Sequence, residues 1–168
     1  MTEPRLVCEP LVRTPDYIKG VITMGVDHTP AEVWEVLTQP VHLTNWLAPG
    51  VIDLRVGGAV RLDFEQSGVA INSQVKALRP LESISFSWSA PGEPERPIEW
   101  AITPKETGSE VRLTVQVPHA EDAARACAGW AAHLEMLAAA LEGAAAKFSN
   151  ETFKSCRAAY AAGDAPSA

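Results

Sequence analysis

The chain has 168 residues, of which 46% are hydrophobic and 21% charged, a composition typical of a folded domain rather than of a disordered chain. Its formal net charge of -7 at pH 7 argues against nucleic-acid binding, because an acidic surface repels phosphate groups. Three cysteines without metal-ligand spacing argue against a disulfide framework and predict a reducing, cytoplasmic location. The most apolar stretch, residues 126–146, is interrupted by one histidine and two glutamates, so we expect no membrane span.

The N-terminal part of the chain changes character near residue 16. Residues 1–15 contain three prolines and show no hydrophobic period, so we interpret them as a flexible arm. Residues 17–26 alternate, with Ile22 and Met24 on one side, which predicts a half-buried strand. We therefore expect one folded domain to span residues 16–148.

Two short helices are predicted next. Thr29 and Glu32 have the spacing of a capping box, in which the threonine hydroxyl accepts from the glutamate amide and the glutamate side chain reaches back. A proline follows the cap at the first helical position, and Pro40 can begin a second helix in the same way. The sequence therefore predicts one helix at 30–38 and another at 40–46.

The hydrophobic period then changes to two residues and predicts six further strands. Apolar and polar side chains alternate along most of them, which is typical of an antiparallel sheet with one face in water. With residues 17–26 they make a sheet of about seven strands. The six strands are expected at residues 51–56, 59–65, 69–79, 83–89, 98–103 and 110–117.

A long amphipathic helix is predicted at residues 121–146, where Trp130, Leu134 and Leu137 share one stripe. Residues 149–168 are interpreted as a helical extension with a loose tail. A seven-stranded sheet is about 30 Å wide, whereas one helix is about 10 Å across. The sheet must therefore curl around the long helix to bury its apolar face, which predicts an α+β fold with a cleft between sheet and helix.

Several runs of sequence, in this order and spacing, resemble one protein superfamily. The run VDHTPAEVWEVLTQPVHLTNWLA (26–48) resembles the opening of the START-like, birch-pollen-allergen-like superfamily (SRPBCC). Residues 53–64, 75–88 and 108–117 resemble the branch named for the activator of heat-shock protein 90 ATPase, and residues 129–141 resemble the start of its C-terminal helix. The resemblance implies a helix-grip fold with a pocket for a small hydrophobic molecule between the sheet and that helix.

The residues expected to line this pocket face one another from two strands and the long helix. Large rings on each wall keep the walls apart, so the space holds either a void or a tightly packed core. The alternative that these side chains are ordinary core residues is therefore left open. The candidate ligand-binding residues are Phe86, Trp88, Trp100, Ile102, Trp130, Leu134 and Leu137, with Trp46 and His133 near the mouth.

No metal, organic cofactor or catalytic residue is assigned from the sequence. The four histidines and three cysteines lack metal-ligand spacing, and we find no nucleotide-binding glycine pattern or nucleophile motif. His133 lies beside the apolar stripe of the long helix. It is interpreted as a half-exposed edge residue, with a polar contact at the pocket mouth or an acid/base group as alternatives.

Three functions are compatible with this fold. The first is a small soluble protein that binds a hydrophobic molecule. The second is a polyketide cyclase-like enzyme that uses the same cavity, which the almost wholly apolar inner positions disfavour. The third is a chaperone-related protein-interaction module, which would need an exposed apolar patch. Chaperone activation is not carried over, because the sequence lacks the additional N-terminal domain of the co-chaperone. A homodimer is left open.

Overall fold

The computed structural model describes residues 5–64, 69–144 and 146–164. Within these ranges the chain forms one antiparallel sheet of nine strands and four helices. The strands are β1 (Arg5–Cys8), β2 (Val12–Arg13), β3 (Ile18–Val26), β4 (Gly50–Ile52), β5 (Ala59–Phe64), β6 (Val69–Arg79), β7 (Ser83–Ser87), β8 (Pro97–Lys105) and β9 (Gly108–Val117). Their order in the sheet is β1-β3-β9-β8-β7-β6-β5-β4, with β2 also paired to β3.

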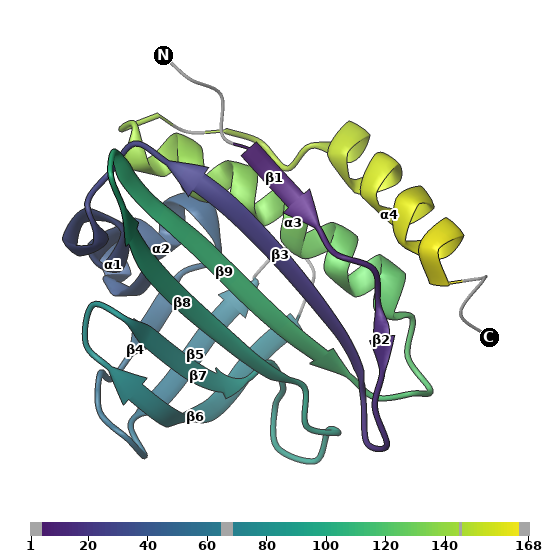
Figure 1. Ribbon diagram of the computed structural model, residues 1–168. Helices are drawn as coiled ribbons and strands as arrows, with labels where there is room; N and C mark the ends of the chain where they lie inside the picture. Colours follow the sequence, from purple (N-terminus) through teal and green to yellow (C-terminus); the bar gives the residue numbers. More distant parts are fainter. Residues whose placement is uncertain (1–4, 65–68, 145, 165–168) are drawn as a thin grey trace.

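The long helix α3 (Ala123–Leu141) lies across the sheet, which curls around it (Figure 1). The helices α1 (Pro30–Thr38) and α2 (Pro40–Trp46) stand at one end of the sheet, and α4 (Asn150–Asp164) packs along α3. The α+β helix-grip fold expected from the sequence is therefore confirmed.

The two short helices begin and end where the sequence predicts. Thr29 Oγ1 accepts a hydrogen bond from the Glu32 amide at 3.2 Å, and the Glu32 carboxylate accepts from the Thr29 hydroxyl at 3.1 Å. The prolines at the first positions of α1 and α2 have φ angles suited to a helix and no amide hydrogen to leave unpaired. These local signals explain why the bounds of both helices are correct.

The expectation of a loose arm is wrong for part of residues 1–15. Strand β1 pairs with β3, with Leu6 opposite Met24 and Cys8 opposite Ile22. Leu6 and Cys8 also pack against the core, while the intervening Val7 is 49% exposed. Four residues are too few for this alternation to be recognised in the sequence, and the strand depends on a partner that is distant in the chain.

Two further boundaries differ from expectation by four or more residues. The strand predicted at 51–56 ends at Ile52, because the chain then folds into a loop in which Gly58 donates to the Arg55 carbonyl at 2.8 Å. The helix predicted to reach residue 146 ends at Leu141. Gly143 has φ 74° and donates to the Ala140 carbonyl at 3.0 Å, an arrangement that terminates a helix. Predictions for residues 1–4, 65, 145 and 165–168 lie outside the described residues.

The capping box of α1 can be tested by removing one hydroxyl. We expect Thr29→Ala to lower the free energy of unfolding by about 1 kcal/mol, because the Glu32 amide loses its acceptor. Urea denaturation monitored by circular dichroism measures this change. Thr44→Ala, at an exposed position inside α2, is the matched control and should stay within about 0.5 kcal/mol of the parent protein. Equal effects of the two substitutions would contradict the assigned cap.

Candidate functional site

Seven ring side chains meet between the sheet and α3, and we call them the aromatic cluster. Neighbouring ring centroids in the cluster lie 4.7 to 6.3 Å apart, mostly in edge-to-face contact. Such contacts are the favoured geometry for aromatic pairs because of the ring quadrupole. The aromatic cluster consists of Trp46, Phe64, Trp88, Trp100, Trp130, His133 and Phe148.

The walls of the cluster follow from the alternation of the strands and the stripe of α3. Trp100 lies in β8 opposite Ile84 of β7 and Leu113 of β9, and all three side chains face the core. Trp130 lies on the facing side of α3, and its ring centroid is 4.7 Å from that of Trp88 and 5.8 Å from that of Trp100. The two walls therefore meet through indole rings.

The cluster is buried at one end and accessible at the other. Trp46 and Trp100 are 1% and 2% exposed, whereas Trp88 and His133 are half-buried and Phe148 is 38% exposed. The ring centroid of Phe148 lies 5.5 Å from that of His133 at this accessible end. A molecule that entered the cluster would therefore meet Phe148, His133 and Trp88 before the buried indoles.

His133 is the one ionisable side chain in the aromatic cluster. Its Nδ1 lies 3.1 Å from the Trp46 carbonyl oxygen. Because a carbonyl oxygen accepts only, Nδ1 carries the proton and Nε2 is left as an acceptor, with no partner among the described residues. Burial lowers the pKa of His133, and the hydrogen bond to Trp46 opposes this shift in part. The imidazole is therefore neutral at pH 7.

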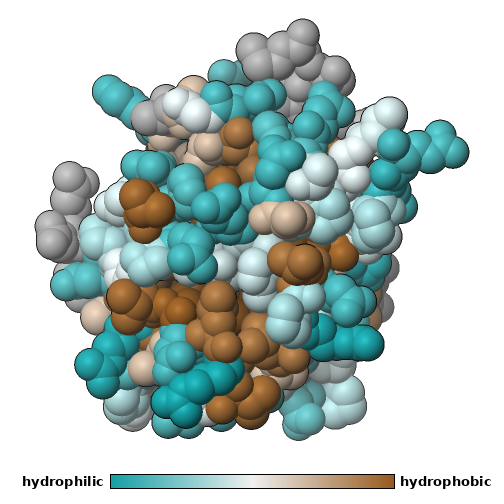
Figure 2. All heavy atoms as spheres, turned by 90° about the vertical axis from the view of Figure 1, so that its left-hand side faces the viewer, coloured by the Kyte–Doolittle hydropathy of each residue, from teal (hydrophilic) through white to brown (hydrophobic). Residues whose placement is uncertain are grey.

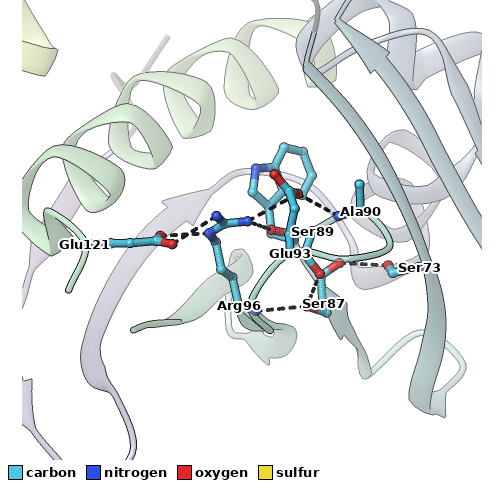
Figure 3. A network of polar contacts seen from close by, with 8 residues as sticks. Ser73, Ser87, Ser89, Ala90, Glu93, Arg96 and Glu121 are labelled. Carbon is cyan, nitrogen blue, oxygen red and sulfur yellow. Dashed lines mark hydrogen bonds and ion pairs between the residues drawn. The ribbon is translucent and has the colours of Figure 1, made fainter. Parts of the chain in front are cut away.

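A network of polar contacts joins the loop after β7 to Glu121, next to the start of α3 (Figure 3). The Arg96 guanidinium binds both carboxylate oxygens of Glu121, with Nε–Oε1 at 2.7 Å and Nη2–Oε2 at 2.9 Å. Arg96 also makes two hydrogen bonds with the backbone of Trp88. Its Nη1 donates to the Trp88 carbonyl at 3.3 Å, and its own carbonyl accepts from the Trp88 amide at 2.7 Å. The Arg96 amide donates to Ser87 Oγ at 2.9 Å. The loop after β7 is thereby tied to the start of α3.

The predicted site residues lie in one region of the structure but differ in how deeply they are buried. Trp46, expected near the mouth, lies at the buried end, while His133 and Trp88 lie at the accessible end. Residues without a ring contact to the cluster belong to the surrounding buried core: Phe86, Ile102, Leu134 and Leu137.

Sequence reasoning missed two members of the cluster. Phe64 continues the alternating inner face of β5, so its position was visible as a pattern although it was not selected. Phe148 lies between α3 and α4 in a segment without hydrophobic period, and no pattern identifies it.

An exposed apolar face was also not predicted. Figure 2 views the molecule from the side of α1, α2 and β4 and shows apolar side chains gathered there. Val41 in α2, Val51 in β4 and Val56 in the loop after β4 are 68%, 48% and 64% exposed. We call this surface the α2–β4 face. Exposed apolar groups of this kind are typical of interaction surfaces.

Two hollows in the described part of the chain lie elsewhere and have polar linings. One, of about 400 Å³, is lined by residues that include Arg61, Lys76 and Glu93. The other, of about 760 Å³, is lined by residues that include Lys19, Glu99 and Arg112. Neither lining suits an apolar ligand.

No group of three His, Cys, Asp or Glu side chains in the described ranges is placed to hold a metal ion. None of the helices in those ranges has the length and apolar character needed to cross a membrane.

The comparisons with known proteins agree with this architecture. A model of the family described as Activator of Hsp90 ATPase homolog 1-like protein matches residues 27–142. The crystal structure of CalU16 from Micromonospora echinospora aligns over 96% of this chain and 98% of its own, with 19% identity and a TM-score of 0.77. EF2215 from Enterococcus faecalis, a conserved protein of unknown function, aligns over 90% and 87%, with 15% identity and a TM-score of 0.74.

DynU16, a protein in the dynemicin biosynthetic locus, aligns over 77% of this chain but 48% of its own, with 25% identity and a TM-score of 0.67. No curated protein matches the chain. The alignments with the first two structures establish a shared fold. Because the sequence identities are low, the ligand of this chain has to be argued from its own residues.

Breaking the ion pair between Arg96 and Glu121 should lower the stability of the protein. We expect Arg96→Gln to lower the free energy of unfolding by about 1–2 kcal/mol, because the half-buried Glu121 loses a charged, two-bond partner. Urea denaturation measures the loss, and a red shift of tryptophan emission would report exposure of Trp88. Arg55→Gln breaks an exposed pair with Asp53 and should cost less than about 0.5 kcal/mol. Similar losses in both variants would show that the network has no special weight.

The neutral state of His133 predicts a pH dependence of stability. Because the folded-state pKa lies below the unfolded value of 6.5, the unfolded chain binds the proton more readily. Stability should therefore be full above about pH 6.5 and fall as the pH drops through 6 toward 5. His133→Asn keeps a donor for the Trp46 carbonyl without titrating, so its urea midpoint should fall less over this range. His42→Asn is the control and should leave the slope unchanged; a parent slope retained in His133→Asn would refute the assignment.

Proposed function

The chain belongs to the family of Activator of Hsp90 ATPase homolog 1-like proteins, and on this premise we propose that it binds a small hydrophobic molecule between the sheet and α3. The observation that carries this proposal is the gradient of exposure in the aromatic cluster. Buried indoles form a rigid floor at Trp46 and Trp100, and half-buried rings form the rim at Trp88 and His133. Apolar surface with a small number of placed polar groups is the usual composition of a small-molecule site.

The chemistry of the rim favours a flat aromatic ligand with a hydroxyl group. Trp88 and Trp130 offer ring edges and faces, which interact best with another aromatic ring. The neutral imidazole of His133 offers Nε2 as an acceptor, which a phenolic hydroxyl can satisfy. A saturated chain would gain from burial alone and would leave Nε2 without a donor.

Entry of a ligand requires one ring to move. Phe148 is the most exposed member of the cluster and lies between two helices rather than in the sheet. Its displacement breaks contacts with His133 and Phe153 but no hydrogen bond of the sheet. We therefore assign Phe148 as the cover of the site.

Two alternative functions, a cyclase-like enzyme and a protein-interaction module, make different demands on the residues. A cyclase-like enzyme needs polar groups that converge on the substrate, and His133 is the only ionisable member of the aromatic cluster. This supports binding rather than catalysis. A protein-interaction module is the second candidate, and the exposed α2–β4 face favours it. A second copy of this chain is one partner that such a face could take. The cytoplasmic location stays a prediction from the sequence.

The binding proposal is tested by titration with phenolic aromatics, fatty acids and sterols. We expect phenolic aromatics to change tryptophan emission and to give a saturable heat signal in calorimetry. Trp130→Phe should weaken binding about 5- to 10-fold, because the smaller ring loses about 1 kcal/mol of contact. Trp34→Phe, at an indole of similar burial outside the cluster, is the matched control and should bind as the parent protein does.

Two further outcomes decide the ligand class and the site. His133→Phe should remove the preference for a phenol over its methyl ether, since it keeps a ring at this position but has no acceptor for the hydroxyl. If no compound binds by either method, or if Trp34→Phe weakens binding as much as Trp130→Phe, the aromatic cluster is core and the proposal fails.

A further inference from the structure

All three cysteines of the chain converge between the first strand and the last two helices. Cys8 lies in β1, Cys127 in α3 and Cys156 in α4. Cys8 Sγ is 3.9 Å from Cys156 Sγ, although 148 positions separate the two residues in sequence. Nothing in the spacing of these residues predicts the contact, since it depends on β1 joining the sheet and α4 folding back along α3.

The two thiols that touch differ from the third. Cys8 and Cys156 are half-buried, so small molecules reach them, while Cys127 is fully buried and a Cβ on Gly20 would overlap its sulfur. Burial raises the pKa of Cys127 to about 12. Because solvent does not reach it, Cys127 is a packing residue against β3, whereas the half-buried Cys8 and Cys156, whose sulfurs are in contact, form the reactive pair.

The surroundings of the pair contain unsatisfied polar atoms. The Tyr160 hydroxyl and one carboxylate oxygen of Glu135 are buried and have no hydrogen-bond partner in the described part of the chain. Burial, and after it the neighbouring Cys8, raise the pKa of Tyr160. The same two causes, in the same order, raise the pKa of Cys156 to about 11. Buried polar atoms without a hydrogen-bond partner are uncommon in a packed core, so their presence beside the cysteine pair indicates a role other than packing.

We propose that Cys8 and Cys156 are a redox modification site, which a small disulfide such as oxidised glutathione converts to an intramolecular disulfide that ties β1 to α4. A disulfide needs its sulfurs about 2.05 Å apart, so each must move by about 1 Å, which side-chain rotation supplies. β1 is a four-residue strand at the edge of the sheet and can follow such a movement. The disulfide would join the edge strand to the last helix, two segments that lie far apart in sequence.

The reaction proceeds by two exchanges. Burial raises the pKa of Cys156 and disfavours its thiolate, so we assign the first attack on oxidised glutathione to Cys8. One glutathione leaves as a thiolate and takes up a proton. The Cys156 thiolate, formed by loss of its proton to solvent, then attacks the Cys8 sulfur and releases the second glutathione. The protein loses two electrons and two protons, and one glutathione disulfide becomes two thiols.

The test uses the full chain in glutathione buffers of defined ratio. We expect the free thiols of the denatured protein to fall from three to one, and peptide mass analysis to find Cys8 joined to Cys156. The disulfide closes a loop of nearly the whole chain, so the melting temperature should rise by at least about 5 °C and return after treatment with dithiothreitol. The rate should increase as the pH is raised, because both steps need a thiolate.

Variants separate this pair from other outcomes. Cys8→Ser and Cys156→Ser should each abolish the disulfide and the rise in melting temperature, whereas Cys127→Ala should retain both. Should Cys127→Ala not fold, the peptide map of the parent protein decides the pairing alone. Glutathione adducts without an internal bond, a bond to Cys127, a bond between two chains, or an unchanged melting temperature would each overturn the proposal.

Discussion

The inner face of the sheet is buried against α3, with α1 and α2 at one end, and this constraint shapes the rest of the molecule. Nine strands are several times wider than one helix, so the sheet must curl for its inner face to be covered. α1 and α2 close one end of the curl (Figure 1). The apolar side chains of the strands then face inward toward α3, and the indoles of the aromatic cluster lie between strands and helix.

Residue size along α3 decides where the sheet lies close and where it lies apart. At Cys127 the helix approaches β3 so closely that Gly20 leaves no room for a side chain. One turn later, Trp130 meets Trp88 and Trp100, and the rings hold helix and strands apart. The distance between α3 and the sheet is therefore small at Cys127 and larger at Trp130. The accessible end of the cluster lies where this distance is larger.

Local signals predict those parts of the fold that local physics determines. The capping box at Thr29 and the proline of α2 specify both helices to the residue, and alternation finds every strand longer than four residues. Non-local contacts determine the rest. β1 exists because β3 offers it an edge, and Trp46 is buried because α2 docks with its indole Nε1 donating to the Val36 carbonyl at 2.9 Å. The sequence places Trp46 on the correct helix but carries no information about this docking.

The same distinction explains the candidate site and leads to the role of α4. Rings in periodic segments, such as Trp100 and Trp130, could be assigned to facing walls, whereas Phe148 has no periodic neighbours. Phe148 takes its place because Phe153 of α4 packs against it at 5.9 Å, and α4 is in turn held to the start of α3 by Arg157 and Asp122 at 3.0 Å. The cover of the aromatic cluster is therefore held by a helix outside the sheet. Movement of this cover costs side-chain contacts alone and leaves the strand ladder intact, so the accessible end can change while the fold is conserved.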